Sequence, residues 1–410
     1  MLLIGKLAFR NVFRNFRRSL LTFLSITIIL GLAIMAIGFT RGFETGSIRT
    51  AINTRTGHVK ILNRNYDTED PLISLDHTIS DPENLMSQLQ NISTVRAYSE
   101  KILFPCSLTD GIDELALTGF GVNLDREDRV FNLSQHVIRG SYLSPGEEKI
   151  LLGSELAKLF GVDVGDFITI ITRTKYNSIN ALDVEIAGIS HFNNPELDNN
   201  AFFFPLDAAQ EFLDMPNQVT EITVFGDNLD RADVLAEDIM EKIDPELYQT
   251  QTWEENLEEL LKFFNLRAKS RMIIYFILLM MAAAGIMNTM LMAVYERTRE
   301  IGTLMAMGFR EGKMIILFAM ESIYIGIFGS ITGCLWGGLV ANYFENNGLD
   351  MNSFGIEMGN LPISPVIYGD IDFSVILTAF ITGILLAFFS ALYPAYKSSK
   401  LVPTEALRAV

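Results

Sequence analysis

The 410-residue chain has few cysteines and histidines and lacks the common motifs of nucleotide and metal enzymes. It contains two cysteines, Cys106 and Cys334, and its four histidines show no metal-ligand spacing. The P-loop pattern G-x-x-x-x-G-K-[ST], the G-x-S-x-G elbow and the H-E-x-x-H motif are all absent. Basic residues are also scarce, with 32 Lys and Arg against 49 Asp and Glu. These absences exclude a P-loop nucleotide site on this chain and argue against a general nucleic-acid-binding protein.

Long apolar runs are what the sequence has instead. Four of them lie at 19–42, 271–295, 314–344 and 373–396, and a single acidic residue, Glu321, interrupts the third. Each run is long enough to cross the hydrocarbon core as a helix, which needs about 20 residues. The first run is too long for a secretory signal and ends without an A-x-A cleavage site, so we interpret it as an uncleaved helix. The sequence therefore predicts a protein with four transmembrane helices.

The charges flanking these runs predict the orientation of the chain. Basic residues concentrate in 1–18, 296–313 and 397–410, whereas 43–270 and 345–372 are acidic. By the positive-inside rule, both termini and the 296–313 loop face the cytoplasm, and the acidic segments face outward.

Residues 43–270 have the patterns of a folded domain that mixes strands with helices. Strands are predicted at 59–62, 167–172 and 184–189, and helices at 84–89, 154–160, 207–213 and 230–243. A polar, helix-prone stalk at 254–270 leads into the second apolar run. The predicted fold class is four transmembrane α-helices with a large two-lobed α+β extracytoplasmic domain between the first and the second.

The N-terminal segment 1–18 is amphipathic. Its bases are spaced three to four residues apart, which places them on one helical stripe: Lys6, Arg10, Arg14, Arg17 and Arg18. This pattern predicts a helix that lies in the headgroup plane, and the alternative is an ordinary basic flank.

The third apolar run contains two features of its own. Gly329, Gly333 and Gly337 recur every fourth residue, which favours a seam of close helix packing over a general tolerance of glycine. Glu321 lies near the cytoplasmic boundary, where it either pairs with a base of the first helix or stays hydrated.

Three segments together resemble a known family. They are LAFRNVFRN at 7–15 followed by RRSLLT at 17–22, YERTREIGTLMAMG at 295–308, and YPAYK at 393–397 followed by PTEALR at 403–408. The set resembles the FtsX-like permeases of ABC systems, which include the LolC/LolE, MacB and FtsX types. Softer similarities at 57–61, 121–123, 150–157 and 161–166 favour the lipoprotein-releasing LolC/LolE branch.

In this family the loop after the second span is a coupling helix that docks on a separate ATPase. The resemblance assigns this role to residues that supply polar groups, an apolar face and, at Gly308, the end of the helix. They are Glu296, Arg297, Arg299, Glu300, Ile301, Gly302, Leu304, Met305 and Gly308. A short amphipathic helix rimmed by charge also suits a groove in a partner.

The resemblance implies a non-catalytic permease subunit that converts ATP hydrolysis below the membrane into mechanical work outside it. Its partners are two copies of an ABC ATPase, a second permease that is identical or a sister chain, membrane lipid, a lipoprotein substrate and a periplasmic carrier. ATP and Mg belong to the ATPase, and no cofactor is expected on this chain. Two alternatives remain open: efflux of peptides or antibiotics with an adaptor and outer-membrane duct, and regulation of a cell-wall hydrolase.

Overall fold

The computed structural model describes residues 2–14, 16–67, 74–192, 194–351, 353 and 366–406. It divides into two compact units, a helical unit and an α+β unit. The helical unit comprises Met1–Thr45, Phe263–Leu349 and Val366–Val410, and the α+β unit is built on Gly46–Lys262. Residues 352 and 354–365 of the connection predicted at 345–372, and residues 407–410 of the predicted tail at 397–410, lie outside the described residues.

Among the described residues, four helical segments are long and apolar enough to cross a membrane. They are α2 (Phe16–Ala51) with the π-helical turn η1 (Ile52–Thr56), α10 (Glu258–Glu296), α12 (Glu311–Asn347) and α13 (Phe373–Ser399). They coincide with the four predicted runs, which confirms the helical part of the predicted fold class. The first helix runs past the predicted boundary at 42, because the residue that ends it is Gly57, whose φ of 60° is left-handed.

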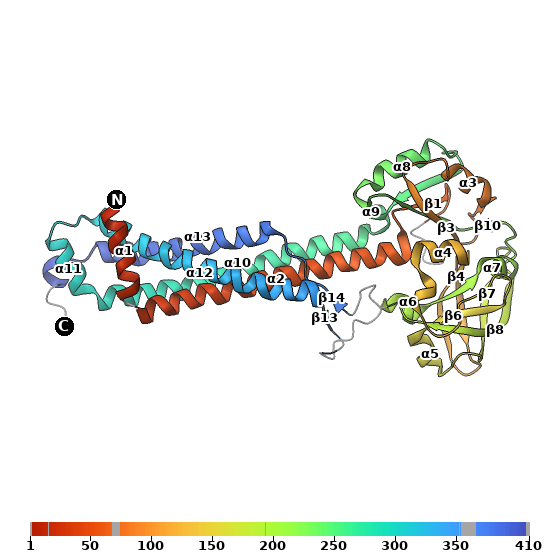
Figure 1. Cartoon of the computed structure of the whole chain (residues 1–410), viewed down its shortest axis with the longest axis horizontal. Coiled ribbons are helices and arrows are strands. Elements are labelled where there is room, and N and C mark those ends of the chain that lie inside the picture. Colours follow the sequence, from red (N-terminus) through yellow and green to blue (C-terminus); the bar gives the residue numbers. More distant parts are fainter. Residues whose placement is uncertain are drawn as a thin grey trace. The chain divides into compact units, whose positions relative to one another are not determined.

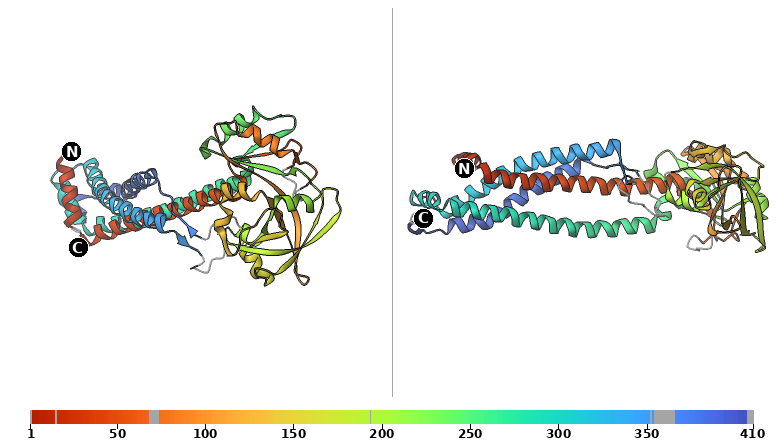
Figure 2. Two further views of the ribbon diagram at one scale, coloured as in Figure 1. Left: turned by 45° about the vertical axis from the view of Figure 1, so that its right-hand side comes forward. Right: turned by 90° about the horizontal axis from the view of Figure 1, so that it is seen from below.

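The N-terminal helix α1 (Leu2–Arg14) lies across the end of the long helices of this unit (Figures 1 and 2). Its buried residues are Ile4, Ala8 and Val12, which are spaced at four-residue intervals along one helical face. The ring of Phe9 packs edge-on against Tyr324 of α12, with centroids 5.5 Å apart. Of the predicted 1–18 helix, residues 2–14 form α1, and Arg17 and Arg18 belong to α2.

Three glycines of α12 face α2. A Cβ atom at Gly333 would lie 3.0 Å from both the Cβ of Leu30 and the carbonyl oxygen of Thr27. One at Gly329 would lie 3.0 Å from Ile26, and one at Gly337 would lie 2.9 Å from the backbone of Gly31. Such distances are shorter than normal carbon contacts, so α2 and α12 approach this closely only because these positions lack side chains.

The segment predicted as a stalk contains a break. The short helix α9 (Trp253–Asn256) begins with a capping box between Thr252 and Glu255 and ends before Leu257. Helix α10 then begins at Glu258 and continues without interruption to Glu296. The predicted continuity with the second apolar run is therefore correct from Glu258 onward and wrong for residues 254–257.

The α+β unit is organised around a sheet that, within the described residues, has ten strands. Their order is β12-β1-β11-β3-β4-β9-β6-β8-β5, and β7 pairs with both β3 and β8. The pairings β3-β4-β9-β6-β8-β7-β3 therefore close a ring. The strands are β1 (Val59–Asn63), β3 (Val95–Thr109), β4 (Glu114–Val122), β5 (Val137–Gly140), β6 (Lys149–Gly153), β7 (Phe167–Arg173), β8 (Ile179–Ser190), β9 (Ala201–Pro205), β11 (Glu221–Gly226) and β12 (Tyr248–Thr252).

The long strand β3 belongs to both halves of this sheet. Its residues 95–101 pair with β11, and its residues 101–109 pair with β4. Helices α3 (Pro82–Leu89) and α8 (Ala232–Met240) accompany the β11 side, while α5 (Ser154–Phe160), α6 (Pro195–Asn200) and α7 (Leu206–Phe212) accompany the ring (Figure 1). This is the predicted two-lobed α+β domain, with one strand shared between the lobes.

Candidate functional site

The candidate site is the end of the helical unit where α1, the loop between α10 and α12, and the last turns of α13 meet. Helix α11 (Thr298–Ala306) forms the middle of that loop, and the short helix α14 (Pro403–Ala406) follows α13. Charged side chains from all of these elements pair with one another here. We call this region the loop end.

A buried ion pair ties the loop to α12. The Nη1 of Arg297 donates to both carboxylate oxygens of Glu321 at 3.3 Å. Arg297 is 8% exposed and Glu321 is 5% exposed, and the guanidinium lies 5.9 Å from the ring centroid of Phe318. The prediction that Glu321 pairs with a base of the first helix, or stays hydrated, is therefore wrong. Arg297 stands at the junction of α10 and α11, where the chain turns and directs this side chain inward.

The bases near the N-terminus pair with the loop instead. Arg14 of α1 and Arg297 both donate to Glu300, the latter through Nε at 3.2 Å. Arg18 of α2 forms an ion pair with Glu296. Glu300 is thus shared by two guanidinium groups, and α1, α2 and α12 are all joined to the α10–α11 loop.

The end of α13 has equivalent contacts. Lys400 bonds to Glu311, at the start of α12, at 2.8 Å, and Lys397 donates to the hydroxyl of Tyr295 at the end of α10. Lys400 and Glu311 are each more than half exposed, so their pair contributes little to stability. The pair between Arg297 and Glu321 differs, because removing one partner would leave a buried charge without its counterion.

The apolar face of α11 points into the helical unit. Ile301 and Gly302 are buried, and Leu304 and Met305 pack against the core formed by α1, α12 and α13. The sequence predicts this face as a docking surface for a partner. Its burial contradicts that expectation for Ile301 and Gly302, because a helix end in a small unit buries its apolar residues against its own neighbours first.

The exposed face of α11 has a different composition. Arg299, Thr303, Ala306 and Met307 are exposed and recur at three- to four-residue spacing, which places them on one side of the helix. Arg310, which is also exposed, follows the turn at Gly308 and precedes α12. This surface, the α11 outer face, combines two bases with one large apolar side chain.

The end of α11 is defined by Gly308. Its φ of 95° is left-handed, its N–H donates to Met305 O at 3.0 Å, and the N–H of Phe309 donates to Leu304 O at 3.1 Å. These two bonds form a Schellman motif, in which glycine is favoured because it lacks a Cβ. Gly308 thus has the position of the predicted cap.

A cavity of about 300 Å³ lies within the loop end, between α1, α11 and α12. It brings together Asn11 and Arg14 from α1, Glu300 and Leu304 from α11, and Phe318 from α12. The remaining predicted bases, Lys6, Arg10 and Arg17, are exposed. They therefore lie on the surface of α1 and α2 and do not line this cavity.

Sequence reasoning missed four partners in this network, Tyr295, Glu311, Lys397 and Lys400. It also missed the pairing of Arg14 and Arg18 with the loop. One signal was present, because Arg14 and Arg18 are four residues apart, as are their acidic partners Glu296 and Glu300.

Comparison with known proteins identifies the family. Residues 19–241 match the MacB-like periplasmic core domain, and residues 272–403 match the FtsX-like permease C-terminal domain. The lipoprotein-releasing system transmembrane protein LolC of Xylella fastidiosa is 23% identical over 410 residues, which cover 96% of this chain and 95% of that protein. LolE of Haemophilus influenzae is 24% identical, with 94% and 93% covered.

Among solved structures, the periplasmic region of MacB from Actinobacillus actinomycetemcomitans is similar, with 14% identity and a TM-score of 0.37. It covers 52% of this chain and 95% of that one. The two family matches together span both units, and the first alone covers more than half of the sequence. The chain belongs to the ABC transporter permeases of the LolC/LolE and MacB type, which join a MacB-like periplasmic core domain to an FtsX-like permease domain.

Proposed function

We propose that this protein is the transmembrane subunit of a lipoprotein-releasing ABC system. It transmits the work of a separate ATPase to lipoproteins anchored in the outer leaflet of the bacterial inner membrane. The observation that carries this proposal is the similarity to LolC and LolE, which extends over nearly the whole of this chain and of those proteins. The chain itself is non-catalytic in this proposal, and ATP and Mg bind to the ATPase.

The loop end faces the cytoplasm in this proposal. The exposed bases of α1 and the bases of the α11 outer face support that orientation, because cytoplasmic segments near membrane helices are enriched in Lys and Arg. The exposed Phe9, Phe13 and Phe16 support an interfacial position for α1, since aromatic side chains favour the headgroup region. Both termini would then be cytoplasmic.

Two ATPase copies bind the loop ends of two permeases, this chain and an identical or sister chain. The α11 outer face is the contact on this chain, with Arg299 and Arg310 meeting acidic groups and Met307 entering an apolar pocket. A groove that accepts a short amphipathic helix is a common mode of recognition.

Force passes from α11 to the long helices through the ion-pair network. Arg297 connects the loop to α12 through Glu321, and Glu300 and Glu296 connect it to α1 and α2 through Arg14 and Arg18. A displacement of α11 therefore has to be followed by the helices it is paired with, or the pairs must break. Helices α2 and α10 each contain residues of both the helical unit and the α+β unit.

Photo-crosslinking in cells tests the cargo. A photoreactive amino acid is placed at Leu32 of α2 or at Phe276 of α10, which are both exposed, and at Leu377 of α13 as a matched control. Capture of a lipoprotein at the first two positions and not at the third is the expected result. Capture of only soluble peptides would reject lipoprotein release and favour efflux.

A further inference from the structure

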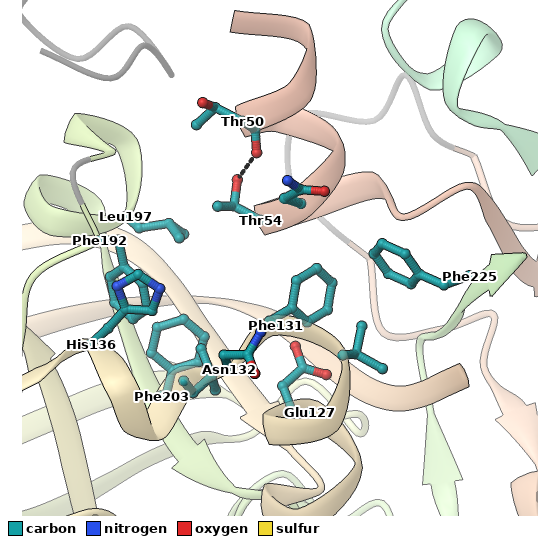
Figure 3. A pocket seen from close by; sticks show the side chains of 13 residues that line it. Thr50, Thr54, Glu127, Phe131, Asn132, His136, Phe192, Leu197, Phe203 and Phe225 are labelled. Atoms are coloured by element: carbon teal, nitrogen blue, oxygen red, sulfur yellow. Dashed lines mark hydrogen bonds between the residues drawn. The ribbon is translucent and has the colours of Figure 1, made fainter. Parts of the chain in front are cut away.

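A second cavity, of about 510 Å³, lies inside the α+β unit (Figure 3). One side is formed by the end of α2 and by η1, and the opposite side by α4 (Leu124–Phe131) and the segment after it. Its lining is mixed: hydroxyl and amide groups come from Thr50, Asn53 and Thr54, while four phenylalanines provide the apolar surface. A cavity with an apolar wall and a few polar groups is the usual form of a small-molecule site.

The aromatic side chains of the cavity are packed against one another. The rings of Phe131 and Phe225 are edge-to-face with centroids 5.4 Å apart, and those of Phe192 and Phe203 are 5.3 Å apart. His136 lies 4.9 Å from Phe192. These contacts hold the rings in fixed orientations around the cavity.

A buried carboxylate also lines this space. Glu127 is 2% exposed, and Figure 3 shows its side chain beside Phe131 and Asn132 in the cavity. Its Oε2 atom has no hydrogen-bond partner among the described residues. A buried carboxyl oxygen without a partner is costly, so a ligand that supplies a cationic donor there, and thereby favours the ionised form, is favoured.

The protein's own lysines only partly neutralise this carboxylate. The Nζ of Lys101 is 3.5 Å from Glu127 Oε1 and 3.8 Å from Glu221 Oε1, so its charge is divided between two acids. The Nζ of Lys60 forms an ion pair with Glu221 Oε2 at 2.9 Å. Burial raises the pKa of Glu127, and the nearby Lys101 and the side chain of Ser99 offset this only in part.

Lys101 also shows that an ammonium group can lie against a phenylalanine ring of the cavity. Its ammonium group lies 4.6 Å from the ring centroid of Phe131, a cation–π distance. Aromatic faces combined with a carboxylate are the usual surroundings of bound organic ammonium groups. The cavity therefore offers a second cation the same two kinds of partner that Lys101 uses.

We propose that this cavity binds a small organic ammonium compound, with its apolar part against the phenylalanine rings and its charged group at Glu127. This site is separate from the loop end and is not required by lipoprotein release. Its polar rim is carried by the same helix that forms the first membrane span, since Thr50 lies in α2 and Thr54 follows in η1. Thr54 also accepts a hydrogen bond from Asn194 at 3.0 Å, which joins this rim to the segment before α6.

The test uses the full-length protein in lipid nanodiscs, without ATPase, and three probes of similar size. They are 2-phenylethylamine, its neutral analogue 2-phenylethanol, and the anion phenylacetate. Binding is measured by saturation-transfer NMR, with signal from empty nanodiscs subtracted. We expect the amine to bind at least tenfold more tightly than the alcohol, and the anion to bind most weakly.

Two variants locate the site. Glu127→Gln keeps the shape of the side chain and should reduce amine affinity about tenfold while leaving the alcohol unchanged. Phe225→Leu, which does not touch the buried charges, should reduce the preference for amine over alcohol and provides the test if Glu127→Gln fails to fold. Equal affinity for amine and alcohol in the unmodified protein, or an amine preference that survives the folded variants, would overturn the proposal.

Discussion

Arg297 and Glu321 form the most deeply buried ion pair among the described residues of the loop end. Both side chains are nearly inaccessible, and the exposed pair of Lys400 with Glu311 provides a natural contrast. Pairs of the exposed kind contribute at most about 1 kcal/mol. Breaking a buried pair by removing one partner costs more, about 3–5 kcal/mol, because the other charge stays buried.

The variant Glu321→Leu should therefore destabilise the helical unit by about 3 kcal/mol, since Arg297 is left without its carboxylate. The double variant Arg297→Met with Glu321→Leu should recover most of that loss, because both charges are gone and apolar groups replace them. Unfolding in detergent, followed by the temperature midpoint, measures both.

The matched control for this pair is Glu311→Leu, which removes the exposed partner of Lys400. Its midpoint should stay close to that of the unmodified protein. If Glu321→Leu proved equally harmless, the buried pair would have no structural role.

Cys106 is a buried thiol in β3 whose chemistry is suppressed by its surroundings. It is 7% exposed, and burial raises its pKa to about 12. Because only the thiolate is nucleophilic, about 10⁻⁴ of this group is reactive at pH 8.

In a Cys334→Ala background, the folded protein should therefore resist iodoacetamide at pH 8 and become alkylated only after unfolding in SDS. Its reactivity should rise only as the pH approaches the raised pKa. Mass spectrometry of the intact chain gives the extent of labelling. Full labelling of the folded protein at pH 8 would show that this thiol is accessible as a thiolate.

Helix α11 has two faces with different predicted roles. The buried face, with Ile301, belongs to the core of the helical unit, and the outer face, with Arg299 and Met307, is available to a partner. Substitutions on the two faces should therefore fail in different ways.

The double variant Arg299→Glu with Met307→Asp should abolish co-purification with the ATPase while leaving the melting temperature of the permease unchanged. Charge reversal and loss of the apolar anchor act only on the interface. Ile301→Asp is the contrasting variant and should lower the melting temperature, because it buries a charge. An undiminished complex with the double variant would refute docking at this face.

The packing of α12 on α2 makes a separate prediction. Gly333→Leu should destabilise the helical unit by about 1–3 kcal/mol, because the new side chain meets Leu30 and the backbone of Thr27. Gly285→Leu in α10 is the matched control, since nothing lies within 4 Å of a Cβ at that position. Thermal unfolding in detergent compares the two, and equal midpoints would contradict a packing role for Gly333.

Elements with a strong local signal were predictable from the sequence. The apolar runs, the helix at 154–160 and the strands at 59–62 and 167–172 all correspond to elements of the structure. Each depends on residues that are close together in the chain. The shared strand β3 was not identified, because its role depends on pairing with β11, which lies more than 100 residues away.

The same limit applies to the loop end. The family motif identified α11, but its burial could not be deduced, since the residues that cover Ile301 come from other helices. The partner of Glu321 depends on the turn at Arg297, which no periodic pattern predicts.

For the molecule as a whole, we propose a permease that receives force at the loop end from a separate ATPase. The MacB-like match at 19–241 includes the first long helix and most of the α+β unit, and the FtsX-like match at 272–403 lies in the remainder of the helical unit. In this proposal, ATP hydrolysed by the ATPase releases lipoprotein through this chain.

The decisive measurement is the release of lipoprotein from proteoliposomes that contain this permease. Release should require the partner ATPase and hydrolysable ATP, and the Arg299→Glu, Met307→Asp variant should abolish it. Release by the permease alone, or undiminished release by that variant, would contradict the account.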